Sequence, residues 1–584
     1  MRRLMWFTIG FCLACLLAVY FLPGSLLGWA ALTGCVCGAA ALLLRPSVFV
    51  KRRTPPPARG GDFGRPMSGN RGDPGSGCPA ILRLVCGGLA LGLIWCWGYD
   101  ALRLSPARAA EGSYERLEAE LRDYPVRTDY GWQADGWASV DGQRIHTRFY
   151  LYGELPELEP GDRIAGSFTL RRADRTKEGE TRLDLQAKGI LLTGSGRVEA
   201  TAKGGSPFRC FPARLSRRIS LRLAELIPAD AAGLPRAMLT GDRGGLTEAD
   251  RNDLSAAGAS HILAVSGLHV SLLMGLLWLI AGRGRRSAFL RIPLLTLYVL
   301  MTGASPSVVR AAVMLVPLLL APLFREENDS PTSLALAGLV LLLGNPWTVA
   351  NLSFQLSFAA VAGLLLVTPP LQAFLESRSP IRRLLRWAGL NRLPHRLRRL
   401  LLGLLRRIVR GLCLSVSASL GALIFTTPIV AAVFGQVPVY GVLTNLLVLL
   451  PAALCLGGSL AVLGLGLIWT ELGALAGWLL AWPARWILWV CRLAARLPGS
   501  LLYMDGYGLS FLIFAFLLIL PALALREKRL GLPLLSLLAA LAIAVGFQRW
   551  DAASADFTLA ALDVGQGQCV CARTDSFTAV IDCG

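Results

Sequence analysis

Long apolar runs, separated by short polar stretches, make up most of this chain. Three of them lie near 4–22, 25–44 and 80–99, and ten more lie near 260–282, 287–303, 305–324, 331–348, 350–368, 411–434, 438–468, 471–490, 508–525 and 531–547. A helix needs roughly 20 apolar residues to cross the hydrocarbon core of a bilayer. The pattern therefore predicts a polytopic α-helical membrane protein with about 13 spans.

Residues 100–205 follow a different pattern, because the long apolar runs stop there. Apolar and polar residues alternate in stretches such as RIHTRFYLYG and DRIAGSFTLRRA, which are separated by turn signals at Asp141-Gly142 and Pro160-Gly161. Several short strands at this spacing predict a small all-β barrel or sandwich.

These changes of pattern divide the chain into parts. We predict N-terminal spans at 1–99 with a disordered linker at 45–79, a β-rich domain at 100–205, amphipathic lead-in helices at 206–259, a membrane domain at 260–547 and an incomplete β-rich domain at 555–584. Within the lead-in, 207–227 is typical of a basic amphipathic helix. Two interpretations of that helix stay open, a position on lipid headgroups and a rim that faces DNA.

Charge adds an orientation to this layout. The chain is 54% hydrophobic, which excludes an ordinary soluble protein, and its net charge of +21 comes mostly from arginine. Basic loops at 51–53, 283–287, 378–410 and 526–529 all fall on one side of the predicted spans. Because basic loops stay in the cytoplasm, we expect a multi-pass membrane protein whose basic loops face the cytoplasm. Its N-terminus is then cytoplasmic, and its β domain and C-terminus are extracytoplasmic.

The run SHILAVSGLHVSLLMGLLWLIAG at 260–282 carries polar residues that hydrocarbon disfavours. His261 and His269 lie eight residues apart and share one helix face, while Ser266 and Gly267 favour close backbone approach or a broken helix. Ser266 and His269 could in principle form part of a hydrolase site. No carboxylate partner is evident beside them, so we set catalysis aside.

Other spans add polar groups. Arg310 lies near the start of one span, and in another Asn351 with Gln355 and Ser353 with Ser357 stand at i,i+4 spacing. Each group alone is typical of interhelical hydrogen bonding. Together they predict a polar interior, to which we assign His261, Ser266, Gly267, His269, Arg310 and Gln355.

The motif ASHILAVSGLHVSLL closely resembles the signature of the ComEC competence family, the inner-membrane channel for DNA uptake in natural transformation. LTGDRGGLTEADRNDLSAAG, PSVVRAAVM and NLSFQLSFAAVAGL are similar to that family in the same order. The resemblance implies a protein of the bacterial plasma membrane, with an external OB-like domain at 100–205 and a channel at 260–547 that passes single-stranded DNA inward. It also implies an external DNA receptor and a cytoplasmic ATPase as partners. The chain contains no G-x-x-x-x-G-K-[ST] phosphate loop, so we expect that it does not power transport by binding nucleotide itself.

The last residues, DFTLAALDVGQGQCVCARTDSFTAVIDCG, resemble the first β-hairpin of a metallo-β-lactamase-like domain. Gln568 and Cys583 depart from that pattern, and the H-x-H-x-D-H metal cluster of such domains is missing. The chain holds four histidines, none of them after His395. We therefore expect a fragment or half of a split gene that has no metal site, no cofactor and no enzyme activity of its own. A divalent metal such as Zn or Mn would belong to the missing domain.

The sequence thus predicts a DNA internalisation channel for natural transformation, with single-stranded DNA and membrane lipids as partners. Two alternatives stay open. One is a permease for a small or lipid-linked substrate, and the other is a membrane-anchored metallohydrolase fragment.

Overall fold

The computed structural model of the chain describes residues 3–43, 78–378, 395–503 and 557–582, apart from short gaps at 24–25, 129–130, 176–180, 205–206, 283–284, 325–328, 563–568 and 575–576. Most of the linker predicted at 45–79 and the spans predicted at 508–525 and 531–547 lie outside these residues. The chain divides into two compact units. The first comprises 1–247, 261–358 and 451–485, and the second comprises 248–260, 359–450 and 486–584.

Several helices of the described chain are long and apolar enough to cross a membrane. Five qualify, at 3–20, 81–109, 403–434, 441–468 and 470–496, and a sixth is the pair 352–366 and 368–377 if that pair, bent by 44°, forms one span. Shorter apolar helices occupy 27–36, 267–278, 289–301, 306–317 and 330–344. These helices support the prediction that the chain is a membrane protein. The predicted number of about 13 spans is not confirmed, because only five or six helices of the described chain meet the length criterion.

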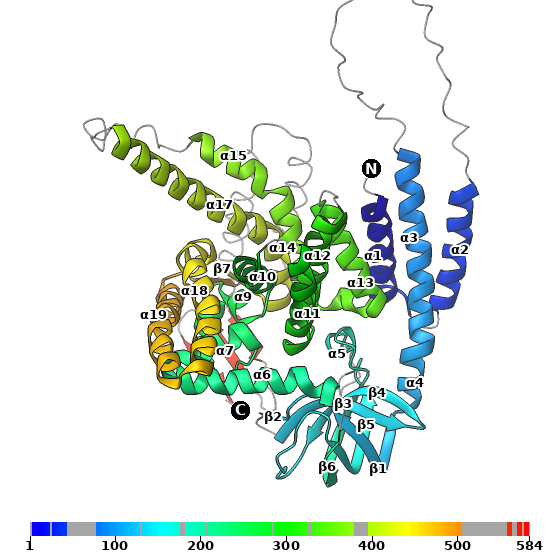
Figure 1. Ribbon diagram of the computed structural model, residues 1–584. Helices are drawn as coiled ribbons and strands as arrows, with labels where there is room; N and C mark the ends of the chain where they lie inside the picture. Colours follow the sequence, from blue (N-terminus) through cyan, green and yellow to red (C-terminus); the bar gives the residue numbers. More distant parts are fainter. Residues whose placement is uncertain are drawn as a thin grey trace, which may run out of the picture. The chain divides into compact units, whose positions relative to one another are not determined.

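In the first unit, the chain opens with α1 (Arg3–Tyr20), α2 (Leu27–Leu43) and α3 (Cys78–Tyr99) (Figure 1). Glycines bring the backbones of α1 and α3 into contact. A Cβ on Gly10 would stand 2.0 Å from the carbonyl oxygen of Val85, and one on Gly88 would stand 2.0 Å from that of Phe7. Any larger residue would push these helices apart. The chain continues from α3 through a π-helical turn, η3 (Asp100–Leu104), into α4 (Ser105–Ala109).

A β domain follows. Its strands are β1 (Gly112–Leu121), β2 (Val126–Thr128), β3 (Gly131–Val140), β4 (Gln143–Leu151), β5 (Arg163–Arg172) and β6 (Leu192–Ala202), with the short helix α5 (Asp184–Ala187) between the last two. The sheet order is β1-β5-β6-β4-β3-β2, and β1 also pairs with β3, so five strands close into a ring. The predicted all-β domain is therefore confirmed, and it is a barrel.

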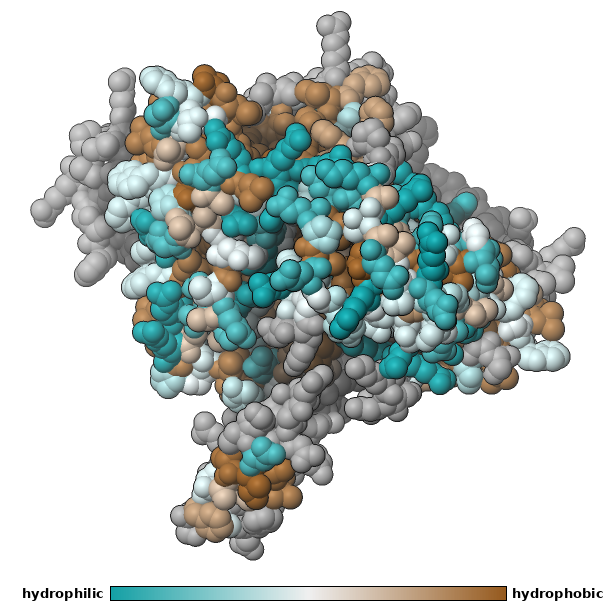
Figure 2. Space-filling model, turned by 90° about the horizontal axis from the view of Figure 1, so that it is seen from below, coloured by the Kyte–Doolittle hydropathy of each residue, from teal (hydrophilic) through white to brown (hydrophobic). Residues whose placement is uncertain are grey.

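Alternating residues fill the barrel. Phe149 and Phe168 are almost fully buried and meet edge to face at 5.4 Å between ring centroids. Other core residues include Ala138, Ile164 and Leu170. Figure 2 shows a face of the molecule on which many hydrophilic residues lie, with smaller hydrophobic patches between them. This surface suits contact with water.

Two elements tie the barrel to the remaining part of the first unit. Arg214 of α6 (Pro207–Leu226) lies 3.2 Å from Glu159 in the β4–β5 loop. On the other side, the Asn345 amide donates to the carbonyl oxygen of Gln186 in α5 at 2.9 Å. Asn345 directly precedes the 3-10 turn η4 (Pro346–Ala350), so the barrel is fixed at two places.

The first unit also contains α7 (Ala229–Thr240), α9 (Ser260–Leu263, with Ser260 itself in the second unit), α10 (Gly267–Ala281), α11 (Arg285–Met301), α12 (Pro306–Phe324) and α13 (Ser330–Gly344). It shares α14 (Leu352–Leu366), α18 (Gly441–Ile468) and α19 (Thr470–Arg496) with the second unit. The second unit adds α8 (Glu248–Ala256), α15 (Thr368–Arg378), α17 (His395–Phe434), and the strands β7 (Gln436–Pro438) and β8 (Leu501–Tyr503).

Near the C-terminal end, β9 (Phe557–Leu562), β10 (Cys569–Thr574) and β11 (Thr578–Ile581) form an antiparallel sheet in the order β11-β10-β9. They occupy the segment where the sequence predicts a β-hairpin. Gln568 and Cys583, the two departures from the metallo-β-lactamase-like pattern, lie outside the described residues.

Candidate functional site

The span predicted at 260–282 is broken at its most polar point. Helix α9 ends at Leu263 and α10 begins at Gly267, while Ser266 between them has an extended backbone with φ −119° and ψ 172°. A shared helix face for His261 and His269 is therefore wrong, because the two histidines belong to different helices. The broken helix that Ser266 and Gly267 favour is confirmed.

Ser266 and His269 cap the second helix. The backbone N–H of Ser266 donates to Nδ1 of His269 at 3.0 Å, and the Ser266 side chain in turn accepts from the backbone N–H of His269. Because Nδ1 accepts a hydrogen bond, the proton of the neutral imidazole lies on Nε2. His269 is buried, so this reciprocal capping box fixes the start of α10 inside the protein.

Arg310 of α12 is also buried, with 7% of its surface exposed. Its Nε donates to Oγ of Ser357 on α14 at 2.6 Å, and its Nη1 lies 3.6 Å from the sulfur of Met314. Oγ of Ser307 lies 3.2 Å from Oγ of Ser357. Within the described part of the chain, Arg310 forms no ion pair.

Gly267 brings the capped helix start against Arg310. A Cβ at Gly267 would stand 2.8 Å from Nη2 of Arg310 and 3.4 Å from Cβ of Ala311. A side chain at this position would force the guanidinium to shift. Four of the predicted residues, Ser266, Gly267, His269 and Arg310, therefore form one cluster, which we call the α10–α12 cluster.

The other two predicted residues lie elsewhere. His261 is exposed on α9, before the break. The side-chain amide of Gln355 donates to the hydroxyl of Tyr20 at 3.1 Å and to the carbonyl oxygen of Val349 at 3.0 Å. Asn351 directly precedes α14 and caps it, because its side chain accepts from the backbone N–H of Ser353 at 2.9 Å. The backbone N–H of Gln355 donates to the carbonyl oxygen of Asn351 at 3.0 Å, as their i,i+4 spacing predicts.

No group of three or more His, Cys, Asp or Glu side chains suited to a metal ion occurs among the residues that the structure describes. The expected lack of enzyme activity and of a cofactor stays a prediction.

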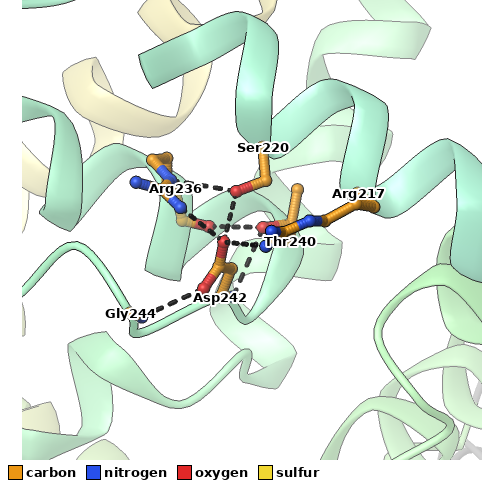
Figure 3. A network of polar contacts seen from close by, with 6 residues as sticks. All are labelled: Arg217, Ser220, Arg236, Thr240, Asp242 and Gly244. Carbon is orange, nitrogen blue, oxygen red and sulfur yellow. Dashed lines mark hydrogen bonds and ion pairs between the residues drawn. The ribbon is translucent and has the colours of Figure 1, made fainter. Parts of the chain in front are cut away.

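A second polar cluster, which sequence reasoning missed, surrounds Asp242 in the loop after α7 (Figure 3). Its carboxylate accepts from Oγ of Ser220 on α6, from Nη2 of Arg236 on α7 at 2.7 Å and from the backbone N–H of Gly244 at 3.0 Å. Arg236 also donates to Oγ of Ser220 at 2.9 Å, which closes a triangle of hydrogen bonds. We call these residues the Asp242 cluster.

The sequence contains a signal for this cluster. Gly241 ends α7 in the left-handed conformation, at φ +83°, and Asp242 follows it directly in the stretch LTGDRGG. Burial opposes ionisation of Asp242, but the hydrogen bonds from Ser220, Gly244 and Arg236 outweigh it and hold the pKa of this carboxyl below its usual value. The charged form of Asp242 therefore joins α6, α7 and the loop.

The β domain has an aromatic and basic strip on its outer face, where β3 and β4 pair. Trp137 lies opposite His146, and their rings stack at 4.9 Å between centroids. The guanidinium of Arg144 lies 5.9 Å from the Trp137 ring centre. Arg148 forms a bidentate ion pair with Asp135, at 2.7 and 2.9 Å.

His146 is the buried end of this strip. Its Nδ1 lies 3.0 Å from the carbonyl oxygen of Gly189, while its Nε2 is buried and has no hydrogen-bond partner among the residues that the structure describes. Burial, reinforced by the charge of Arg122, lowers the pKa of His146. The imidazole is therefore neutral at neutral pH, and Trp137 stacks on an uncharged ring.

Residues 238–529 of the chain match the Competence protein family. The match covers half of the chain and includes the α10–α12 cluster. Of the Asp242 cluster it includes Asp242 and Gly244 but not Ser220 or Arg236. No solved structure matches the chain.

A curated relative, ComE operon protein 3 of Bacillus subtilis (strain 168), is 32% identical over 145 residues. This alignment covers 24% of the chain and 19% of the relative, so the chain matches about a fifth of that protein's length. Together with the family match over the membrane helices, it confirms the resemblance that the 260–274 motif predicts. The chain belongs to the Competence protein family and is a ComEC-type competence protein.

Proposed function

We propose that this protein is a DNA internalisation channel, which passes single-stranded DNA across the cytoplasmic membrane during natural transformation. The observation that carries the proposal is the α10–α12 cluster, a buried cation and a capped helix start within the apolar helices of the family-matched region. Ionisable groups in membrane helices normally face a bundle interior or a polar path.

A strand of DNA carries a negative charge at each phosphate, so hydrocarbon alone cannot conduct it. A path needs water, hydrogen-bond donors and positive potential. The break between α9 and α10 supplies backbone donors, and Arg310 supplies positive charge. Irregular backbone at membrane depth is tolerated only beside protein or water, which is consistent with a polar interior.

We further propose that the β domain is OB-like and holds the strand outside the membrane. The strand order supports this proposal. The strands β5-β1-β3-β4 lie in Greek-key order, and β6 closes the barrel between β5, to which it is antiparallel, and β4, to which it is parallel. OB-folds bind single strands by stacking bases on aromatic residues in a basic groove. The strip around Trp137 and Arg144 offers both kinds of group.

For the whole chain we propose about 13 spans, a cytoplasmic N-terminus, and an extracytoplasmic β domain and C-terminus. The chain itself acts as a channel rather than an enzyme and uses no cofactor of its own. An external DNA receptor delivers the DNA, and a cytoplasmic ATPase drives transport, because the sequence contains no nucleotide-binding phosphate loop.

Deleting the gene in a transformable host tests this function. We expect surface binding of labelled DNA to remain and entry of DNA into a nuclease-resistant state to be lost, with entry restored by the intact gene. Undiminished entry in the deletion strain would contradict the proposal. Loss of uptake of a small solute without loss of DNA entry would instead indicate a permease.

A further inference from the structure

Arg310 presents an electrostatic problem that the protein's own described residues do not solve. A buried positive charge in membrane helices is costly unless an anion or a set of hydrogen-bond acceptors compensates it. The guanidinium contacts Oγ of Ser357 and the sulfur of Met314, and both of these groups are neutral. Nη2 has no acceptor among the described residues.

The groups around Nη2 make the imbalance larger. Nη2 lies against Gly267, the first residue of α10. The first N–H groups of a helix have no acceptor inside it, and those of Gly267 and Leu268 find none elsewhere in the described chain. The helix dipole adds partial positive charge at the same place. Hydrogen-bond donors and positive charge therefore meet at the start of α10, and no anion among the described residues compensates them.

We propose that Arg310 and the N-terminus of α10 form an anion site that binds one phosphodiester group of the DNA strand as it passes. This inference rests on the proposed channel function and specifies which residues contact the phosphate. A phosphodiester carries one negative charge, which matches the single guanidinium. Its two free oxygens can accept from Nη2 and from the helix N–H groups together.

The surroundings favour a ligand from inside the protein over a lipid. Arg310 is 7% exposed, and its contacts are to α10, α12 and α14, so its guanidinium is enclosed by helices. Gly267 then has a defined role. Alanine there would place a methyl group 2.8 Å from Nη2 and displace the guanidinium from the helix start.

The test replaces the resident gene of a transformable host with variants of this chain. We expect Arg310→Met, which keeps an unbranched apolar stem but loses the charge, to reduce DNA entry about ten- to a hundredfold. Arg310→Lys keeps the charge and should lose less, and Gly267→Ala should also reduce entry. Arg485→Gln is the matched control, because Arg485 pairs with Asp230 at 2.7 Å and lies outside the cluster.

Equal abundance of the variants in the membrane shows that they fold. Abundant Arg310→Met with undiminished entry would overturn the anion site, while loss of entry on gene deletion would still uphold the channel. If deletion itself leaves entry unchanged, the channel function fails instead.

A binding experiment identifies the source of the phosphate. The purified chain in nanodiscs of zwitterionic lipid is heated with oligothymidylate, with a methylphosphonate oligomer of the same length, or with inorganic phosphate. We expect the charged oligomer alone to stabilise the protein, and to do so less in Arg310→Met. Stabilisation by inorganic phosphate alone, or only by adding phosphatidylglycerol to the nanodiscs, would overturn the assignment to DNA.

Discussion

At the scale of single residues, Asp242 is the acceptor on which three segments depend. Ser220, Arg236 and the backbone of Gly244 all donate to its carboxylate. Ser220 also accepts from Arg236, so each side chain orients the other. Removing the charge of Asp242 would leave the Arg236 guanidinium with a weaker acceptor and release the loop from both helices.

We therefore expect Asp242→Asn to lower the stability of the full chain in detergent by about 1–2 kcal/mol at pH 7. The pKa of Asp242 lies below its usual value, so its ionised form stabilises the fold above the unfolded-state pKa of about 4. This contribution disappears as the pH falls through the lowered folded-state pKa. The difference between variant and parent in thermal unfolding should therefore shrink under acid conditions.

Asp141→Asn is the control for this measurement, because Asp141 is exposed in the β3–β4 turn. This substitution leaves the hydrogen bonds of the Asp242 cluster in place. A constant difference between Asp242→Asn and the parent from pH 7 to pH 3 would show that the charge of Asp242 does not stabilise the loop.

At the scale of elements, the patterns that the sequence displays locally are the ones that could be predicted. The turn at Asp141 and Gly142, both with positive φ, joins β3 to β4 as a two-residue hairpin, and these residue types favour that turn. The sequence at Ser266 and Gly267 allows two local alternatives, close backbone approach or a broken helix, and the structure has the broken helix. In contrast, the contact of Gly267 with Arg310 and the joining of Ser220 to Asp242 depend on how distant helices pack, which no local pattern encodes.

The strip on β3 and β4 gives a test at the same scale. If the β domain holds single-stranded DNA, Trp137→Ala should weaken binding of oligothymidylate to the full chain about tenfold, because each stacked base contributes about 1–3 kcal/mol. Fluorescence anisotropy measures the affinity. Trp469→Ala is the control, since Trp469 is exposed but lies between α18 and α19. Equal affinity of Trp137→Ala and the parent for the oligomer would show that this strip does not bind DNA.

At the scale of the whole molecule, the positions of the basic residues and of the helices support the same proposed orientation of the chain in the membrane. The arginines between Arg396 and Arg410 lie on α17, which runs on to Phe434 as a single helix, so the span predicted from residue 411 begins within a longer helix. A basic helix end of this kind stays in the cytoplasm. Under the proposed orientation, the β domain lies on the opposite side of the membrane.

Cysteine labelling in intact cells tests this orientation. Glu154→Cys places a thiol in an exposed loop of the β domain, and Arg406→Cys places one on the exposed basic part of α17. We expect a membrane-impermeant maleimide to label Glu154→Cys in intact cells and Arg406→Cys only after the cells are permeabilised. The parent chain, with its 14 native cysteines, gives the background at each step. Labelling in the reverse order would place the β domain in the cytoplasm, where it could not receive DNA before the strand crosses the membrane.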